Sequence, residues 1–368
     1  MTARRSRRRM MILTEGKLGV FSSKTATALI RYRPAEVACV LDSKAARSGK
    51  PLEEFIGVGQ GIPIVGSVSA GMKLGNRPTQ LVIGIAPVGG QLPAPWRKIV
   101  LEAIGAGLDI VNGLHYAFND DAELAECARK KKVRLNDVRV PPPGLGVALD
   151  KLRGLKQRRI AVVGSDCSVG KMVTALEVDR GLRERGWDSE FIATGQTGIM
   201  IAGSGMAVDH VMSDYVNGAM EQLCWERRKR QVVVIEGQGS VYHPAYSAVT
   251  VSMLHGAMPH GMIFAHAALR SRMSHYEQFA IPPLPQAIRL VEDLTAPVFP
   301  ARVLAVSLNT VGMNDAEAER AAREAESTTG LPACDPVRHG AAKLVDAVAA
   351  VLAKQLLLAT EGTENTEK

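Results

Sequence analysis

The stretch Val162–Val178, VVGSDCSVGKMVTALEV, places a glycine-rich loop between an apolar strand and a helix. The strand is predicted over 159–163, and the loop runs from Gly164 to Lys171. Such loops bind phosphate through backbone N–H groups and the positive end of the helix dipole. In nucleotide hydrolases a Ser or Thr follows the lysine and binds Mg²⁺, but this chain has Met172 there.

The missing hydroxyl narrows what the loop is expected to do. Thr174 lies about 200° further round the helix at ~100° per residue, so it is a poor substitute. Phosphoryl transfer depends heavily on the metal, whereas holding a diphosphate requires only amides and a lysine. Coenzyme A carries such a diphosphate, so we expect the loop to bind a CoA ester, with ATP and Mg²⁺ as the alternative. The residues expected to bind it are Gly164, Ser165, Asp166, Cys167, Ser168, Val169, Gly170, Lys171 and Met172.

Strands and helices alternate on both sides of this loop, which predicts an α/β fold with two parallel sheets. The second half has a strand that leads into a glycine-rich turn within 188–198, and further candidate strands at 231–235, 261–269 and 302–310. The run at 231–235 leads into Glu236, which is typical of a Walker B strand. The first half has candidate strands at 37–42, 62–68, 80–86 and 109–115, with a helix at 95–107.

The expected organisation is a Rossmann-like domain followed by a P-loop NTPase-like domain. Three consecutive prolines break helix and strand alike, and they indicate a linker. The predicted boundaries are a basic disordered tail at 1–10, the Rossmann-like domain at 11–140, the linker at 141–150, the P-loop domain at 151–355 and a disordered tail at 356–368.

Composition favours a protein that acts on a small molecule. The chain has 368 residues, of which 46% are apolar and 22% charged, and its net charge is +8. Aromatic residues make up only 4%, which argues against a nucleic-acid surface, and no apolar run is long enough for a bilayer. The five cysteines are scattered, so we expect reduced thiols, a cytoplasmic location and no metal site. We also expect a homo-oligomer.

Several motifs together resemble a known family. The pattern G-x-D-x-x-V-G-K resembles the dethiobiotin-synthetase branch of P-loop proteins. The wider set resembles a family long catalogued as a domain of unknown function: SKTATALIRYRPAEVACVLDS (23–43), GLHYAFNDD (113–121), GSDCSVGKM (164–172), EGQGSVYHPAY (236–246) and DPVRHG (335–340). Some members of that family are D-glutamate N-acetyltransferases, so the resemblance implies acetyl transfer from acetyl-CoA to the amine of D-glutamate.

Such a reaction needs a general base for the amine. Asp166, Glu236 and His243 are the candidates near the loop, and if Asp166 and Glu236 lie close together, their like charges are expected to raise the pKa of one of them. The alternatives are a structural strand-end acid for Glu236 and a packing or capping histidine for His243. Cys167 is either a nucleophile, for which the sequence offers no paired histidine, or a filler residue of the loop.

The acceptor amino acid needs its own contacts. We expect His115, Gln196, Gln238 and Arg270 to bind it, with Lys24 and Arg272 as further candidate cations. His115 lies in the loop 112–121, which follows a strand as ligand-binding loops do, and we expect the acceptor between the two domains. The alternative is a polar loop whose aspartate caps the next helix.

Two other functions stay open at this point. The chain could be a ligase or kinase that uses Mg²⁺ and ATP, with Asp166 and Glu236 binding the metal, and Met172 argues against it. It could also be a non-catalytic sensor of nucleotides or CoA, although the sequence shows no DNA- or peptide-binding module.

Overall fold

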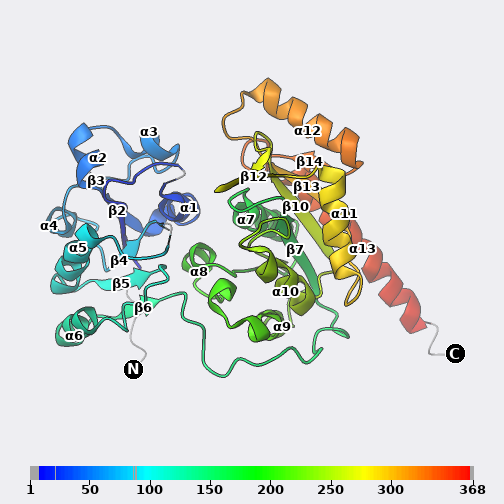
Figure 1. Ribbon diagram of the computed structural model, residues 1–368, viewed down its shortest axis with the longest axis horizontal. Helices are drawn as coiled ribbons and strands as arrows, with labels where there is room; N and C mark the ends of the chain where they lie inside the picture. Colours follow the sequence, from blue (N-terminus) through cyan, green and yellow to red (C-terminus); the bar gives the residue numbers. More distant parts are fainter. Residues whose placement is uncertain (1–7, 21, 86, 88, 365–368) are drawn as a thin grey trace. The chain divides into compact units, whose positions relative to one another are not determined.

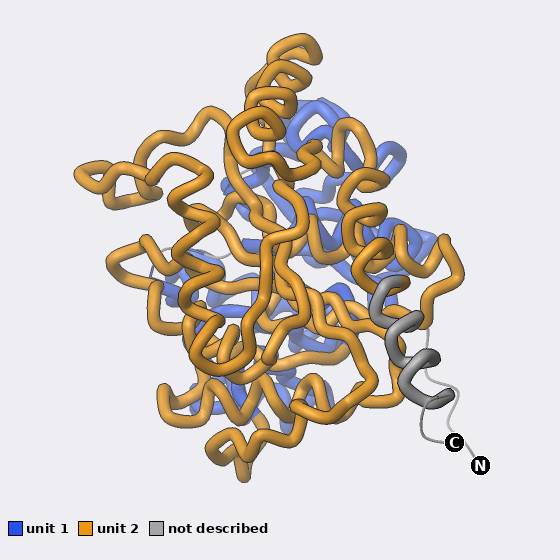
Figure 2. Tube along the Cα trace, turned by 90° about the vertical axis from the view of Figure 1, so that its right-hand side faces the viewer, with its two compact units in different colours: residues 1–141, 199–203 blue, residues 142–198, 204–368 orange. Residues whose placement is uncertain are grey.

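The computed structural model describes residues 8–20, 22–85, 87 and 89–364, with side chains up to residue 353. The chain divides into two compact units, coloured separately in Figure 2. Unit 1 comprises Met1–Pro141 together with Ile199–Gly203. Unit 2 comprises Pro142–Gly198 and Ser204–Lys368.

Unit 1 is built on a six-stranded parallel sheet in the order β3-β2-β1-β4-β5-β6 (Figure 1). This is the strand order of the Rossmann fold, so the fold class predicted for the first half is confirmed. The strands are β1 (Met10–Leu13), β2 (Val37–Leu41), β3 (Ile64–Val65), β4 (Gln80–Ile83), β5 (Asp109–Asn112) and β6 (Leu135–Asp137).

Strand β1 is the central strand of that sheet, yet the sequence analysis did not predict it. All four of its residues are buried, and it pairs with β2 on one side and β4 on the other. The run Met10–Leu13 directly follows a cluster of arginines, so the sequence pattern there resembles the end of a basic tail and not a strand. Met10 therefore belongs to the sheet, and residues 1–7 of the predicted tail lie outside the described residues.

The helices of unit 1 bury an apolar stripe against the sheet. Leu13 of β1, Leu81 of β4 and Val100 of α5 belong to one buried cluster. Removing such side chains from water is the main force that stabilises the layer. The helices are α1 (Lys24–Tyr32), α2 (Ser43–Ser48), α3 (Leu52–Ile56), α4 (Val68–Met72), α5 (Ala94–Gly105) and α6 (Ala122–Lys131), with the 3₁₀ turn η1 (Pro34–Glu36).

Unit 2 is built on a second six-stranded parallel sheet in the order β14-β13-β10-β7-β9-β8. The phosphate-binding loop follows the inner strand β7, so the predicted P-loop fold is also confirmed. The strands are β7 (Arg158–Gly164), β8 (Ser189–Ile192), β9 (Val232–Ile235), β10 (Gly261–Ala267), β13 (Val303–Asn309) and β14 (Ala333–Cys334).

Two short strands outside this sheet, β11 (Arg272–Met273) and β12 (Tyr276–Ala280), pair antiparallel as a hairpin. The sequence analysis did not predict this hairpin. The helices of unit 2 are α7 (Lys171–Glu184), α9 (Val216–Glu226), α10 (Ser247–Ala257), α11 (Leu284–Thr295), α12 (Asp315–Thr329) and α13 (Ala342–Glu364), with the 3₁₀ turns η2 (Val208–His210) and η3 (Ser213–Tyr215). Helix α8 (Gln196–Ala202) begins in unit 2, and its residues from Ile199 onward belong to unit 1.

The segment predicted as a linker is held against unit 2. The backbone amides of Leu149 and Lys151 donate hydrogen bonds to the carboxylate of Glu221 in α9. At the other end, α13 continues to Glu364, so the helix runs past the predicted domain end at residue 355. Among the described residues, no helix combines the length and apolar character needed to cross a bilayer.

Candidate functional site

The loop between β7 and α7 has the backbone shape of an anion cradle. Gly170, the N-cap of α7, has φ 110°, and Ser168 has φ 55°, so both lie in the left-handed region. Because the N-cap is a glycine, it offers no side chain to cap the first turn of α7. The first amides of a 14-residue helix, with the positive end of its dipole, therefore face the loop.

Strand ends pack closely around this loop. A Cβ on Gly237, the residue after Glu236, would overlap the carbonyl oxygen of Val162 and come within 3.1 Å of Cδ of Lys171. Only glycine allows β9 to leave the sheet so close to the loop. The acidic end of β9 is therefore held next to the phosphate-binding loop, as the Walker B pattern predicts.

Lys171 and Thr174 lie on the first turn of α7. Lys171 is only 7% exposed, and its Nζ donates a 2.7 Å hydrogen bond to the backbone oxygen of Asp166 inside the loop. The hydroxyl of Thr174 is 2.7 Å from that of Ser307 in β13, within the protein core. Thr174 is thus engaged away from the loop, in agreement with the expectation that it cannot replace the hydroxyl missing at Met172.

Asp166 is the centre of a hydrogen-bond network. Its Oδ1 accepts from the amide of Cys167 at 2.6 Å. Its Oδ2 accepts from Arg270 Nη1 at 2.9 Å and from the amide of Ser274 at 2.8 Å. Arg270 also donates to the carbonyl of Cys167 at 2.6 Å. Asp166 is fully buried, so this network fastens the loop to the β11–β12 hairpin.

Arg270 is predicted to contact a substrate carboxylate, but its guanidinium donates hydrogen bonds to Asp166 and Cys167 of the loop. The other candidate cations lie elsewhere: Arg272 begins β11, and Lys24 begins α1 in unit 1, both with exposed side chains. A role of these three residues toward substrate stays a prediction.

His243 is a buried histidine with both ring nitrogens engaged. Nδ1 accepts from the amide of Ala245 at 3.2 Å, so Nε2 carries the proton and faces the carbonyl of Ser274, also at 3.2 Å. Its ring stacks on Tyr246 and meets Tyr276 edge-on, with centroids 4.8 and 5.1 Å away. These contacts favour the packing alternative over the role of general base, because the free lone pair that a base needs is occupied.

The structure also brings together a possible metal-binding group. One donor atom each from Asp166, Cys167 and His243 lie within 4.8 Å of one another. A metal-bound histidine normally donates its second ring N–H to an acceptor. Nδ1 of His243 instead accepts a hydrogen bond from Ala245, and Arg270 already neutralises Asp166. The hydrogen bonds at this group therefore do not fit a metal ion.

Glu236 is buried at the end of β9. Its Oε2 accepts from the amides of Thr194 at 2.9 Å and Gly195 at 3.2 Å. Burial raises the pKa of the carboxyl to about 7, and these backbone hydrogen bonds oppose the rise. The nearby acid that adds to the rise is Asp209, and not Asp166 as the expected like-charge pair would require. The two carboxylates face different neighbours: Asp166 faces the hairpin, and Glu236 faces the end of β8.

The two glutamines predicted to bind substrate lie beside Glu236. Gln238 Nε2 donates to the hydroxyl of Thr194 at 3.2 Å, and this hydroxyl donates to the backbone oxygen of Glu236 at 2.7 Å. Gln196 begins α8, two residues after Thr194, and is partly exposed. The ends of β8 and β9 thus gather one acid of raised pKa and two amides.

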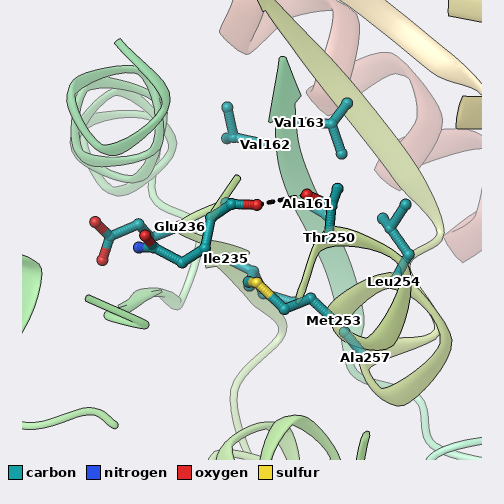
Figure 3. A pocket seen from close by; sticks show the side chains of 11 residues that line it. Ala161, Val162, Val163, Ile235, Glu236, Thr250, Met253, Leu254 and Ala257 are labelled. Atoms are coloured by element: carbon teal, nitrogen blue, oxygen red, sulfur yellow. Dashed lines mark hydrogen bonds between the residues drawn. The ribbon is translucent and has the colours of Figure 1, made fainter. Parts of the chain in front are cut away.

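A small void lies behind this loop, between β7, β9 and α10 (Figure 3). Ala161, Ile235, Met253 and Leu254 are among its walls, and the hydroxyl of Thr250 donates to Gln238 O at 2.7 Å. Its volume of about 10 Å³ is the space of about one water molecule. Figure 3 shows the Glu236 carboxylate pointing away from it, so the void is not a substrate pocket.

In unit 1, the loop 112–121 holds itself together with its polar side chains. Asp121 caps α6 by accepting from the amides of Glu123 and Leu124, and it pairs with Arg97 at 2.8 Å. Asp137 accepts from the side chain of Asn112 and the amides of Phe118 and Asn119. This confirms the capping alternative for the aspartate.

His115 is a further residue of that loop. Its side chain is exposed, and a Cβ on Gly90 would contact its ring. Its role toward the acceptor stays a prediction.

The sequence analysis missed two contacts of the phosphate-binding loop. Ser165 Oγ lies 2.9 Å from Nδ1 of His266 in β10, whose pKa burial lowers to about 4, so the imidazole is neutral. Ser274 of the hairpin donates its amide to Asp166. Neither residue lies in a motif, and only the pairing of β7 with β10 would have pointed to His266.

Comparison with known proteins gives a consistent result. Residues 146–345 match a P-loop domain described as a domain of unknown function, DUF1611_C, and residues 45–141 match its Rossmann-like partner, DUF1611_N. Two similar proteins are named D-glutamate N-acetyltransferase. The one from Tritonibacter scottomollicae is 39% identical over 74% of this chain and 81% of its own length. The one from Pseudoalteromonas sp. is 35% identical over 76% and 83%.

A solved structure agrees with these matches. The crystal structure of a DUF1611 family protein from Anabaena variabilis is 36% identical, with a TM-score of 0.88. The similarity covers 93% of this chain and 99% of that one.

Proposed function

Because the chain belongs to the DUF1611 family, we propose that it is an N-acetyltransferase that moves the acetyl group of acetyl-CoA to the amine of D-glutamate. The observation that carries this proposal is the similarity of most of the chain to two D-glutamate N-acetyltransferases. The phosphate-binding loop supports the donor, since it offers amides and a lysine to a diphosphate but no hydroxyl to Mg²⁺.

The positions of the strand ends beside the phosphate-binding loop suggest how acetyl-CoA would lie. The pantetheine arm has about a dozen bonds, so when extended it reaches roughly 15 Å at about 1.25 Å per bond. With the diphosphate in the loop, the thioester would lie well away from Asp166 and Cys167. The ends of β9 and β8 are on one side of β7 at spacings of about 4.8 Å, within reach of the arm.

Glu236 is the group we propose as the general base. A pKa of about 7 leaves the carboxyl partly ionised near neutral pH, which suits proton transfer from an ammonium group. Gln196 and Gln238 lie beside it and offer amides to the acceptor. We assign Asp166, Arg270 and His243 to positioning of the loop, because their polar atoms bond to the loop and to the hairpin.

We propose the following transfer of the acetyl group and of the two protons. Glu236 takes one proton from the ammonium group of the acceptor, and the free amine attacks the thioester carbonyl carbon. A C–N bond forms, the C–S bond breaks, and the second amine proton goes to the leaving thiolate to give free CoA. The first proton passes from Glu236 to solvent, so the products are N-acetyl-D-glutamate, CoA and one proton.

An end-point assay with the purified full-length chain tests the proposal. D-glutamate or L-glutamate is incubated with acetyl-CoA in EDTA, and both the free thiol and the mass of the acetylated product are followed. We expect product with D-glutamate. A parallel incubation with ATP and Mg²⁺ follows release of ADP or phosphate. Nucleotide cleavage without acetyl transfer would instead support a ligase or kinase.

A further inference from the structure

Helix α8 begins directly beside the proposed base, and a glycine of its first turn lies against the carboxyl. Gly198 is the third residue of α8, and it is buried. A Cβ at this position would lie 2.2 Å from Oε2 and 3.1 Å from Cδ of Glu236. Real Cβ atoms do not come as close as 2.2 Å to another heavy atom, so the carboxyl occupies the space that a side chain at residue 198 would need.

Backbone conformation does not explain this glycine. Glycine is favoured where φ is positive, but the φ of Gly198 lies outside that region. Inside a helix, glycine is also destabilising relative to alanine. Gly198 therefore lowers the stability of α8, and what it provides in return is room for the carboxyl of Glu236.

From these contacts we infer that Gly198 is a positioning residue for the proposed general base: its lack of a side chain lets α8 pack on the carboxyl of Glu236 while two backbone amides bind that carboxyl. The inference rests on the proposed function, because it takes Glu236 as the base. Gly198 acts through Glu236 and not on the substrate, so it is not a catalytic residue.

The backbone around this contact leaves the carboxyl little freedom. Oε2 of Glu236 accepts from the amides of Thr194 at 2.9 Å and Gly195 at 3.2 Å, the two residues before α8. A Cβ on Gly198 would also lie 3.1 Å from Cβ of Ala193, which is buried directly after β8. An alanine at residue 198 would therefore displace the end of the Glu236 side chain from its two amide donors.

A second glycine of the same turn shows the same relation to a side chain that follows β9. A Cβ on Gly195 would lie 2.5 Å from Nε2 of Gln238, and the φ of Gly195 is also outside the positive region. Gln238 Nε2 donates to the hydroxyl of Thr194 at 3.2 Å. Both glycines thus leave room for a polar side chain that the site needs at that place.

Displacement would change the acidity of the carboxyl as well as its position. Burial is the main cause of the raised pKa of Glu236, and Asp209 of η2 adds a like charge. Hydrogen bonds from the amides of Thr194 and Gly195 and from the side chain of Gln238 oppose the rise. A carboxyl pushed out of this buried place should have a pKa closer to the ordinary 4.5, so it would be a weaker base in the wrong position.

Gly198→Ala tests the inference by two independent measurements. Steady-state kinetics with acetyl-CoA and D-glutamate should show turnover reduced about 10²-fold, since a misplacement of about 1 Å can cost that much. The acid limb of the pH profile should move to lower pH, and the affinity for acetyl-CoA should not change. Urea unfolding at pH 5 and pH 8 should show a smaller loss of stability with rising pH than in the wild-type chain.

Gly105→Ala is the matched control. Gly105 is also a helical glycine without positive φ, and a Cβ there would meet no atom within 4 Å. We expect it to match the wild-type chain in both measurements. Should Gly198→Ala not fold, the double variant with Glu236→Ala, which removes the overlapping carboxyl, should fold, and its failure to do so would overturn the inference.

The outcomes separate this inference from the proposed function. If Gly198→Ala has the turnover and pH profile of Gly105→Ala, or if its unfolding keeps the wild-type dependence on pH, the positioning role is overturned while acetyl transfer by the wild-type chain still stands. A fall in turnover with an unchanged pH profile would also overturn it. If the wild-type chain transfers no acetyl group, the proposed function fails, and the unfolding measurement still decides whether Gly198 sets the state of Glu236.

Discussion

Helices α6 and α7 both begin after a polar loop at the carboxyl edge of a parallel sheet, but their first turns differ. Asp121 caps α6, and Arg97 pairs with that aspartate. The N-cap of α7 is Gly170, which has no side chain to cap the helix, and Lys171 lies at its start. The aspartate of the first loop caps the helix that follows it, whereas the second loop places a lysine and the positive end of a helix dipole where an anion can bind.

The carboxylates of the two regions differ in the same way. The Arg97 guanidinium holds the pKa of Asp121 well below its ordinary value, so this carboxylate stays ionised and structural. Among the residues that the structure describes, Glu236 has no cation as a hydrogen-bond partner, and burial raises its pKa to about 7. A carboxyl that is paired stabilises a fold, whereas one that is buried and unpaired can exchange a proton in the physiological range.

Glu236→Gln should have the largest effect on activity. The amide can still accept from Thr194 and Gly195 but cannot take a proton, so we expect turnover to fall about 10²- to 10⁴-fold. Steady-state kinetics at pH 8 would measure it, with the affinity for acetyl-CoA as the control. Turnover within a few-fold of wild type would remove Glu236 from the mechanism.

The same substitution should change the pH dependence of stability. The pKa of Glu236 is higher in the folded chain than the ordinary 4.5, so the folded state binds more protons between pH 4.5 and about 7. Its free energy of unfolding therefore falls as pH rises through this window, by on the order of 3 kcal/mol. Glu236→Gln should remove that loss, which urea unfolding at pH 5 and pH 8 would reveal.

Lys171→Ala should strongly weaken the binding of acetyl-CoA and leave the fold intact. A charge-assisted contact to a phosphate is worth roughly 1.5–3 kcal/mol, or about tenfold to more than a hundredfold in Kd. Calorimetry with acetyl-CoA measures the loss, and Lys130→Ala, which removes an exposed lysine paired with Glu126, is the control. Equal affinity in Lys171→Ala and wild type would mean that the lysine does not contact the phosphates.

Asp121→Ala should destabilise the fold and leave the binding of acetyl-CoA unchanged, since it removes the cap of α6 and the partner of Arg97. We expect the free energy of unfolding to fall by about 2 kcal/mol, of which the cap contributes about 1 kcal/mol. Urea denaturation would measure it, and the Kd for acetyl-CoA should not change. A stable Asp121→Ala chain that had lost donor binding would contradict the contrast between the two helices.

His115→Ala tests whether the self-satisfied loop of unit 1 has any role toward the acceptor. We expect a several-fold rise in KM for D-glutamate or a similar fall in turnover, with unchanged affinity for acetyl-CoA. If both kinetic parameters match the wild-type values, His115 is an ordinary loop histidine and the acceptor lies elsewhere.

The sequence allowed the fold class and the phosphate-binding loop to be predicted because both are local patterns. Strand periodicity and the motif 164–172 involve neighbouring residues, and the parallel sheets followed from them. The central strand β1 was missed because four apolar residues after an arginine cluster carry little signal.

The contacts that organise the site are not local. Asp166 and Arg270 are separated by 104 residues. At His243, Nε2 faces Ser274 of the hairpin, whereas Nδ1 accepts from Ala245, which is close in sequence. The raised pKa of Glu236 depends on its burial and is opposed by hydrogen bonds from Thr194 and Gly195, which no motif around Glu236 encodes. Residue types at the site could therefore be predicted, but not the division between catalytic and positioning groups.

The central claim is that the loop before α7 holds a diphosphate without magnesium, because Met172 offers no hydroxyl to the metal. Calorimetric titration of acetyl-CoA into the full chain in excess EDTA, repeated with Mg²⁺, tests it most directly. The account predicts the same Kd in both buffers. Binding that disappears in EDTA and returns with Mg²⁺ would contradict it and favour a nucleotide-cleaving enzyme.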